Sequence, residues 1–169
     1  GLMLMMLGKQ FYGVDKVIVI EPSELRRNMA IDLGADVVID PDNQDPIARV
    51  MEITDNQGAN AIFTACPVIE THKQAIKMVA KRGVVNFFGG VPKDEPEISL
   101  LSNFIHYREA YITGSHGSTP EQHKPALNLI ANKSVDISSL VSESVPLSDI
   151  MRGFELAASG KLAKVMVTP

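Results

Sequence analysis

Two residues near the start of the chain have the types and spacing of a dinucleotide-binding site. Gly1 opens an apolar run, and Glu21 ends the β-branched run KVIVIE 20 residues later. In dinucleotide-binding units a glycine-rich turn precedes a helix, and an acid about 20 residues after the glycines binds the hydroxyls of the adenosine ribose. We therefore interpret Gly1 as the last glycine of such a turn and Glu21 as the ribose-binding acid.

Other origins of the same pattern stay open. Gly1 is also compatible with a tag remnant or an arbitrary terminus, and Glu21 with a solvated acid at a strand end. A carboxylate at Glu21 would repel a 2′-phosphate, which favours NAD over NADP. Arg26, in the first turns of the next helix, could stack on adenine, bond the ribose or simply be solvated. Together with Arg27 it keeps NADP open as the cofactor.

The elements that must hold these residues alternate between strands and helices. Short β-branched runs are typical of buried parallel strands, and the stretches between them have helical length and apolar faces. Strands are predicted at 16–21, 36–40, 59–66, 84–90, 108–115, 140–146 and 163–168, and helices at 2–12, 23–34, 45–58, 68–83, 120–133 and 147–160. The alternation predicts an α/β fold whose functional loops follow the carboxyl ends of parallel strands.

The order of elements predicts a Rossmann-type doubly wound parallel sheet that lacks its first strand and most of its glycine-rich turn. In the strand order 3-2-1-4-5-6 the first strand is central. Its absence leaves the strands at 17–21 and 61–65 without their shared neighbour. We divide the chain into an N-terminally truncated NAD-binding domain, residues 1–135, and a C-terminal segment, residues 136–169, that would return to a catalytic domain outside this chain.

Bulk composition argues against several other classes of function. The 16 Lys and Arg residues against 20 Asp and Glu give a net charge of −4, with no basic stripe that would attract nucleic acid. The apolar run at 2–7 is far shorter than the roughly 18 residues of a membrane span, so no membrane partner is expected. Cys66 is the only cysteine, which rules out an internal disulfide and fits a reducing, cytoplasmic setting.

Four strings of the sequence, taken together and in order, resemble one known family. They are VIVIEPSELRRNMAIDLGAD, KRGVVNFFGGVP, YITGSHGS and SGKLAKVMVTP. The resemblance is to the nucleotide-binding half of the medium-chain, zinc-dependent alcohol dehydrogenases, in particular their polyol or sorbitol branch, and it covers essentially the whole chain. It implies a parent enzyme that transfers hydride between NAD and a secondary alcohol, with a catalytic zinc held by the missing N-terminal domain.

The resemblance also implies cofactor contacts at the carboxyl ends of two strands. Cys66 and Pro67 would pass near the adenine-side ribose, although they depart from the family's usual Ser/Thr-Gly pair. Gly89, Gly90 and Val91 would run past the nicotinamide ribose, because a missing Cβ lets a ligand approach the main chain. An ordinary turn at the end of the strand is the alternative for the two glycines.

Three further contacts follow from the same resemblance. Ser115 and His116 match the segment whose backbone meets the nicotinamide carboxamide. Lys164 matches a basic residue that reaches the pyrophosphate, and a lysine that only keeps a strand edge soluble is the alternative. Family dimers join their sheets nearby, so a homo-oligomer through the 109–115 strand edge is expected.

The remaining histidines give no metal site from their spacing. His72, His106, His116 and His123 lack zinc-like spacing and have no Cys pair beside them. We expect His72 and His123 to be exposed on helices, His106 to lie in a surface or interface turn, and Cys66 to be a buried strand-end residue rather than a nucleophile.

Two rival functions stay open beside the dehydrogenase. One is a non-catalytic nucleotide-binding module, and the other is a zinc-free relative of the quinone-reductase type. The dehydrogenase hypothesis gives the parent a small-molecule alcohol or polyol substrate and NAD as cofactor. The chain alone is expected to be inactive, because the substrate and zinc contacts of the family come largely from the missing half.

Overall fold

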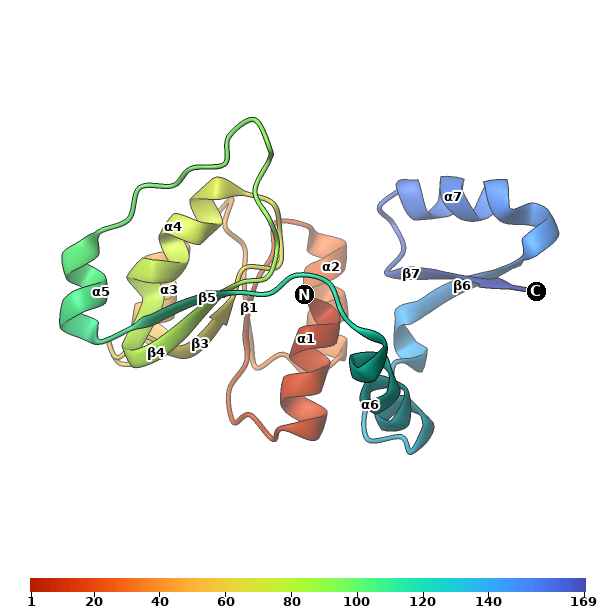
Figure 1. The fold of residues 1–169 in the computed structure, drawn as a ribbon, viewed down its shortest axis with the longest axis horizontal. Helices are drawn as coiled ribbons and strands as arrows, with labels where there is room; N and C mark the ends of the chain where they lie inside the picture. Colours follow the sequence, from red (N-terminus) through yellow and green to blue (C-terminus); the bar gives the residue numbers. More distant parts are fainter.

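The computed structural model describes residues 1–169, and its strands form three separate, entirely parallel sheets (Figure 1). One sheet pairs β1 with β2, the second has the order β3-β4-β5, and the third pairs β6 with β7. The strands are β1 (Ile18–Ile20), β2 (Val37–Ile39), β3 (Ala59–Phe63), β4 (Val79–Phe87), β5 (Tyr111–Gly114), β6 (Val141–Pro146) and β7 (Lys164–Thr168). The predicted α/β fold with parallel strands is confirmed.

The helices cover both faces of the first two sheets. They are α1 (Leu2–Met6), continued by the π-helical turn η1 (Leu7–Phe11), and α2 (Glu24–Asp32), α3 (Pro46–Ile53), α4 (Ile69–Met78), α5 (Ser102–Arg108), α6 (Pro120–Ala131) and α7 (Ile150–Ala158), with 3₁₀ turns η2 (Ser138–Leu140) and η3 (Leu147–Asp149). Val19 of β1 packs in the cluster around Met6 of α1, whereas its neighbour Ile18 packs in the cluster around Val50 of α3. Successive residues of β1 therefore face opposite helix layers, as in a doubly wound fold.

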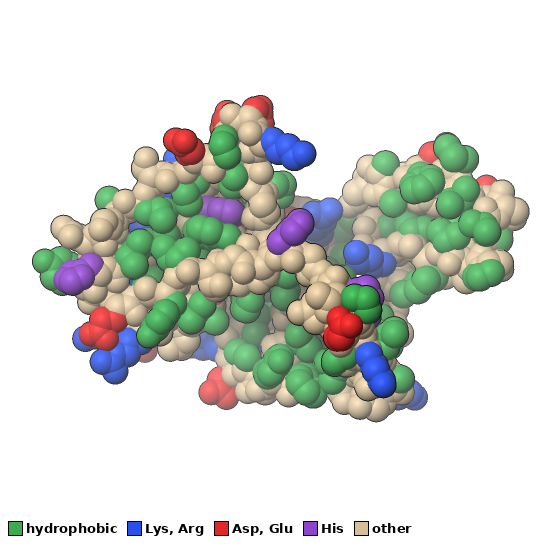
Figure 2. All heavy atoms as spheres, in the orientation of Figure 1, with side chains coloured by type: hydrophobic (Ala, Val, Ile, Leu, Met, Phe, Trp, Pro, Cys, Tyr) green, Lys and Arg blue, Asp and Glu red, His purple; other side chains and the backbone are tan.

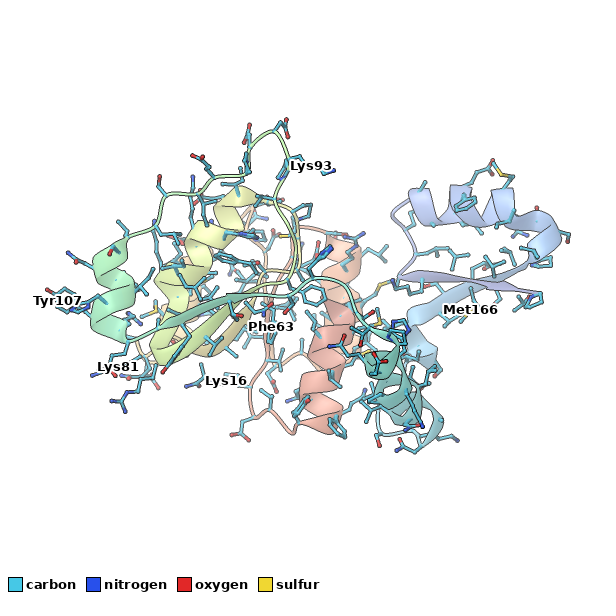
Figure 3. The ribbon with its side chains drawn as sticks, viewed as in Figure 1. Lys16, Phe63, Lys81, Lys93, Tyr107 and Met166 are labelled. Atoms are coloured by element: carbon cyan, nitrogen blue, oxygen red, sulfur yellow. The ribbon has the colours of Figure 1, made fainter.

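The sheet is interrupted at the predicted place. In the strand order 3-2-1-4-5-6, β2 and β1 correspond to strands 3 and 2, and β3, β4 and β5 correspond to strands 4, 5 and 6. No backbone hydrogen bond joins β1 to β3, so each strand has one unpaired edge. Phe63 of β3, labelled in Figure 3, is 52% exposed although it lies in what would be the middle of the sheet.

Apolar side chains pack the β1-β2 pair against the β3-β4-β5 sheet. The cluster is centred on Ile39, Val50 and Met78. Ile18 of β1 and Ile62 of β3 pack against it from the two sides of the interruption. Dispersion and apolar burial thus replace the backbone pairing that a continuous sheet would have.

Several element boundaries differ from the prediction. The helix expected at 45–58 ends at Ile53, and the strand expected at 108–115 begins at Tyr111. The helix expected at 68–83 ends at Met78, and β4 begins at the next residue, where Val79 pairs with Ala59 of β3. A close backbone approach at Gly58, before β3, makes this early ending possible, because its missing Cβ leaves room for the carbonyl oxygen of Met78. The segment around His106, expected as a surface or interface turn, forms the helix α5 (Ser102–Arg108), which also includes the first residue of the strand expected at 108–115.

The C-terminal unit of β6, α7 and β7 stands apart from the other two sheets (Figure 1). Its small core is Val145 of β6 with Gly153 of α7, where the missing Cβ lets the helix approach the strand. Figure 2 shows apolar side chains gathered on this unit, and Leu147, Met151 and Phe154 are among its exposed residues. The division of the chain near residue 135 stays a prediction.

Asp36 connects the N-terminal helical segment to the first strand. Its carboxylate accepts hydrogen bonds from the backbone N–H of Val17 at 2.6 Å and from Lys9 Nζ at 2.9 Å. The Val17 hydrogen bond, followed by the bond to Lys9, holds the pKa of Asp36 below its ordinary value. A carboxyl group with a lowered folded-state pKa stabilises the protein above its unfolded-state pKa and loses that contribution as the pH falls through the folded-state value.

We therefore expect Asp36→Asn to flatten the acid side of the stability profile. The unsubstituted protein should lose thermal stability below about pH 4 more steeply than the variant, and the two should differ most at neutral pH. The measurement is the thermal midpoint from pH 3 to pH 7, with Asp32→Asn, at an exposed position of α2, as control. Parallel profiles for the parent and Asp36→Asn would contradict the expectation.

Candidate cofactor-binding site

Most of the predicted site residues follow the carboxyl ends of parallel strands. Glu21 directly follows β1, and Cys66 follows β3 by a few residues. Gly89 follows β4, and Ser115 directly follows β5. The parallel register of β3, β4 and β5 brings their carboxyl ends together, with Phe63 opposite Asn86 and Asn86 opposite Thr113. This is the edge at which ligands bind in open α/β sheets.

The start of α1 lies among the charged residues of this edge. Desolvation lowers the pKa of the Gly1 α-amine, and the Glu21 carboxylate opposes this effect. Lys164 and Arg26 lower the same pKa further by charge repulsion, whereas Cys66 raises it. Residues from the ends of β1 and β3, the start of β7 and the first turn of α2 are therefore near enough to the beginning of α1 to act on its charge. Glu21, Arg26, Cys66 and Lys164 are residues that the sequence assigns to the cofactor, and each of them acts on the charge at Gly1.

One carboxylate oxygen of Glu21 accepts a hydrogen bond from the protein, and the other accepts none. Its Oε1 accepts a hydrogen bond from the backbone N–H of Ser23 at 3.0 Å, while no protein group donates to Oε2. Ser23 in turn is the N-cap of α2, and its side chain accepts from the N–H of Arg26. The turn between β1 and α2 is thus fixed by local hydrogen bonds, and the half-buried carboxylate keeps an acceptor for a ligand hydroxyl.

The two neighbouring arginines have different surroundings. Arg26 is exposed, and its guanidinium forms no hydrogen bond or ion pair with the protein. Arg27 is committed, because its guanidinium bonds backbone carbonyl oxygens of the β1–α2 turn and pairs with Asp40 after β2. Sequence reasoning missed the role of Arg27 and Asp40. The pair depends on the register of β1 and β2, in which Ile20 lies opposite Ile39 and the acids Glu21 and Asp40 follow side by side.

The two glycines after β4 differ in their surroundings. A Cβ on Gly89 would lie 2.7 Å from the carbonyl oxygen of Cys66, so this glycine serves the contact between the ends of β3 and β4. A Cβ on Gly90 would meet no protein atom within 4 Å, so its backbone borders open space. Val91 is half-buried, and the loop that continues to Lys93 extends beyond the sheet (Figure 3). Gly90 is therefore the glycine whose main chain a ligand can approach.

Cys66 is half-buried rather than buried and lies beyond the end of β3. Its Sγ is 3.4 Å from Oγ1 of Thr71 in α4, while Pro67 beside it is exposed. Ser115 is fixed to the sheet, because Nδ2 of Asn86 donates to its Oγ at 2.8 Å. The side chain of His116 is exposed and makes no hydrogen bond.

Lys164 begins β7 and faces an apolar hollow between α1 and the C-terminal sheet. The hollow has a volume of about 180 Å³ and is lined by Met3, Ile137, Leu140, Val141, Lys164, Val165 and Met166. Lys164 is exposed and forms no ion pair with the protein. It is therefore a free cation on the side of the site where α1 begins, consistent with either a pyrophosphate contact or a solvated edge lysine.

One prediction about the histidines is wrong. His72 was expected to be exposed on its helix, but it is only 4% exposed. Its ring stacks on Phe87 of β4 at a centroid distance of 4.3 Å, and its Nε2 has no hydrogen-bond partner. The helix α4 turns this position toward the sheet, where a planar ring packs on another ring. The exposed positions of His106 and His123 agree with the prediction.

The described residues do not form a metal site. No group of three or more His, Cys, Asp or Glu side chains is arranged to hold a metal ion. The chain therefore offers no ligand set that fits a zinc ion.

None of the helices is both long enough and apolar enough to cross a lipid bilayer.

Comparisons with known proteins agree with the fold. A family model described as zinc-binding dehydrogenase matches residues 1–132. The sorbitol dehydrogenase of Halalkalibacterium halodurans is 27% identical over 169 residues, which are 100% of this chain and 49% of that protein. The scyllo-inosose 3-dehydrogenase of Thermotoga maritima is 31% identical over 140 residues, which are 82% of this chain and 35% of that protein.

A solved structure supports the same conclusion for the fold. A zinc-binding-dehydrogenase-type protein from Sinorhizobium meliloti, solved with NADP bound, superimposes with a TM-score of 0.84 at 24% identity, over 97% of this chain and 49% of that chain. The fold is thus the Rossmann-type domain of the medium-chain alcohol dehydrogenases. The chain belongs to the zinc-binding dehydrogenase family and spans about half the length of the sorbitol dehydrogenase that it matches.

Proposed function

We propose that this chain is the cofactor-binding half of an NAD-dependent, zinc-containing alcohol or polyol dehydrogenase. The observation that carries the proposal is the Glu21 carboxylate, which ends β1 with one oxygen free beside the start of α1. An acid at this place accepts hydrogen bonds from the ribose hydroxyls of NAD and repels the 2′-phosphate of NADP. The Sinorhizobium meliloti neighbour was solved with NADP, so the choice of NAD rests on Glu21 itself.

Each group of site residues would contact a different part of the cofactor. Glu21 and Arg26 would hold the adenosine ribose, with Cys66 and Pro67 passing beside it. The start of α1 at Gly1, together with Lys164, would favour the pyrophosphate, since a helix N-terminus and a free cation both attract anions. Gly90, with Gly89 and Val91, would leave room for the nicotinamide ribose. Ser115 and His116 would border the carboxamide.

The bound nicotinamide ring would accept the hydride from the alcohol. This chain's own residues bind and orient the cofactor. The zinc of the family finds no fitting ligand set here, so no step through a metal is assigned to this chain. We propose that the chain alone is inactive and that the catalytic zinc is bound by another part of the full-length protein.

A polyol or a related secondary alcohol is the proposed substrate class. Support comes from the matched relatives, one of which is a sorbitol dehydrogenase and another a scyllo-inosose 3-dehydrogenase. We also propose assembly as a homo-oligomer through residues 109–115, because β5 pairs only with β4 and all of its residues are exposed. A cytoplasmic location remains a proposal that rests on the single cysteine, Cys66.

Cofactor binding tests the proposal directly. In the full-length protein, Glu21→Ala should weaken NADH binding by roughly 10- to 100-fold, because hydrogen bonds to a charged group are worth about 1.5–3 kcal/mol. NADPH binding should weaken less or improve, since the repulsion of the 2′-phosphate is removed. The measurement is the dissociation constant of each cofactor, followed by the fluorescence of the bound reduced nicotinamide.

A neighbouring acid supplies the matched control. Glu24 is exposed in the first turn of α2, so Glu24→Ala should leave both dissociation constants unchanged. An unsubstituted protein that binds neither NADH nor NADPH, or a Glu21→Ala variant that binds NADH as well as the parent, would refute the proposed cofactor site. Binding without any alcohol oxidation by the full-length protein would favour the non-catalytic nucleotide-binding module instead.

A further inference from the structure

The side chain of Arg27 lies under the turn that carries Glu21. Its Nη1 donates to the backbone carbonyl oxygens of Glu21 at 3.0 Å and of Pro22 at 2.5 Å. Its Nη2 pairs with Oδ2 of Asp40 at 2.9 Å. One guanidinium therefore connects two successive carbonyl groups of the β1–α2 turn to the end of the neighbouring strand β2.

The Asp40 carboxylate is itself held in place. Its Oδ2 accepts from Nδ2 of Asn43 at 2.9 Å, and its Oδ1 accepts from the N–H of Asp42 at 3.1 Å. These bonds, with the charge of Arg27, hold the pKa of Asp40 below its ordinary value, so the carboxyl group is ionised at neutral pH. The Arg27 and Asp40 side chains are 18% and 21% exposed, so water screens this pair less than it screens a surface pair.

The Arg27–Asp40 ion pair reduces the charge repulsion between carboxylates at the ends of β1 and β2. Ile20 and Ile39 are paired in the β1-β2 register, so Glu21 and Asp40 leave the two strands side by side. Two adjacent carboxylates repel each other, and a cation beside them relieves the repulsion. Arg27 is that cation, and its planar fork also fixes the backbone of the turn.

We propose that Arg27 is a positioning residue for the Glu21 turn and that Asp40 determines cofactor selectivity by keeping Arg27 bound there. A guanidinium close to the ribose site would otherwise attract the 2′-phosphate of NADP. The inference rests on the proposed function, because it assigns these two residues a part in the choice between NAD and NADP.

The test is the ratio of the NADPH to the NADH dissociation constant in the full-length protein. Asp40→Asn keeps the size of the side chain and removes the charge that holds Arg27. The ratio should fall by about fivefold or more, a change that roughly 1 kcal/mol would produce. In the double variant Arg27→Gln/Asp40→Asn the ratio should return toward that of the unsubstituted protein, since no guanidinium is left to release.

Arg27→Gln alone tests the positioning role. It should weaken NADH binding severalfold without improving NADPH binding, because the turn loses its support but no cation becomes free. Asn43→Ala is the matched control, since it removes a hydrogen bond to Asp40 while both charges stay, and its ratio should not change. Thermal midpoints of all variants show which of them fold. If Arg27→Gln does not fold, the cofactor ratio of Asp40→Asn alone tests the inference.

The outcomes separate this inference from the proposed function. Unchanged ratios in Asp40→Asn, in a protein whose NADH binding still depends on Glu21, would overturn the inference alone. A protein that binds neither cofactor would overturn the proposed function, and the inference with it. A purely structural role of the pair would lower the thermal midpoint and weaken both cofactors equally, and this result would also overturn the inference.

Discussion

Gly58→Ala is expected to destabilise the protein by about 2–5 kcal/mol, which is a large part of the stability of a typical domain. Gly58 is buried, and its φ of +83° lies in the left-handed region that side chains disfavour. A Cβ there would lie 2.6 Å from the carbonyl oxygen of Met78 and 2.9 Å from the amide nitrogen of Ala80. Both atoms belong to the backbone where α4 passes into β4, so they cannot move aside as a flexible side chain could.

A second glycine separates the two contributions to this cost. Gly34, after α2, has a φ of +97°, but a Cβ there would meet nothing within 4 Å. Gly34→Ala should therefore cost only the backbone strain of about 1–2 kcal/mol. The measurement is the free energy of unfolding in urea for both variants. Equal losses of unfolding free energy would show that the contact of the added Cβ with the backbone of Met78 and Ala80 costs nothing, and would contradict the prediction.

Gly89→Ala is expected to lower both stability and NADH affinity. A Cβ at this position would lie 2.7 Å from the carbonyl oxygen of Cys66, and the N–H of Gly89 donates to the carbonyl oxygen of Thr64 at 2.6 Å. The added methyl group must therefore push apart the ends of β3 and β4, which we expect to cost about 1–3 kcal/mol. The same displacement moves Cys66 and Gly90, so NADH binding should weaken by at least about tenfold.

The adjacent glycine provides the control for this variant. A Cβ on Gly90 would meet no protein atom within 4 Å, so Gly90→Ala should change the free energy of unfolding by no more than about 0.5 kcal/mol. Its NADH affinity should still fall, because the methyl group intrudes into the space proposed for the nicotinamide ribose. Unfolding in urea and NADH titration of both variants check the pair. If Gly90→Ala bound NADH like the parent, the cofactor would not pass this turn.

Local signals in the sequence were sufficient for most of the fold. Ser23 caps α2, and Asp45 caps α3 with Pro46 in its first turn, as these residue types do at helix starts. Gly34 follows the end of α2 with a positive φ, a conformation that glycine adopts without strain. The β-branched runs at 17–20 and 37–39 became strands because their hydrophobic side chains face helices on both sides.

The misses come from long-range contacts that no local pattern contains. α4 ends at Met78 because Val79 pairs with Ala59, a contact between residues 20 positions apart. His72 is buried because Phe87 of a later strand offers a flat surface for its ring. At the proposed site, the chain order of glycine, acid and double glycine predicts residues that follow the carboxyl ends of β1 and β4, and their role toward a cofactor stays a prediction. The Arg27–Asp40 pair was missed because it depends on which strands are neighbours in the sheet.

The interruption between β1 and β3 has a mechanical consequence for the cofactor site. Glu21 is carried by the β1-β2 pair, whereas Gly90 follows the β3-β4-β5 sheet, and these two bodies share apolar packing but no strand pairing. Hydrogen-bonded strands resist sliding because their donors and acceptors must stay in register, but packed side chains allow small shear displacements. Within residues 1–169 the distance between the carboxyl ends of β1 and β4 is therefore compliant, and a strand that paired with both open edges would stiffen it. The stiffness of this distance is set by the cluster around Ile39, Val50 and Met78.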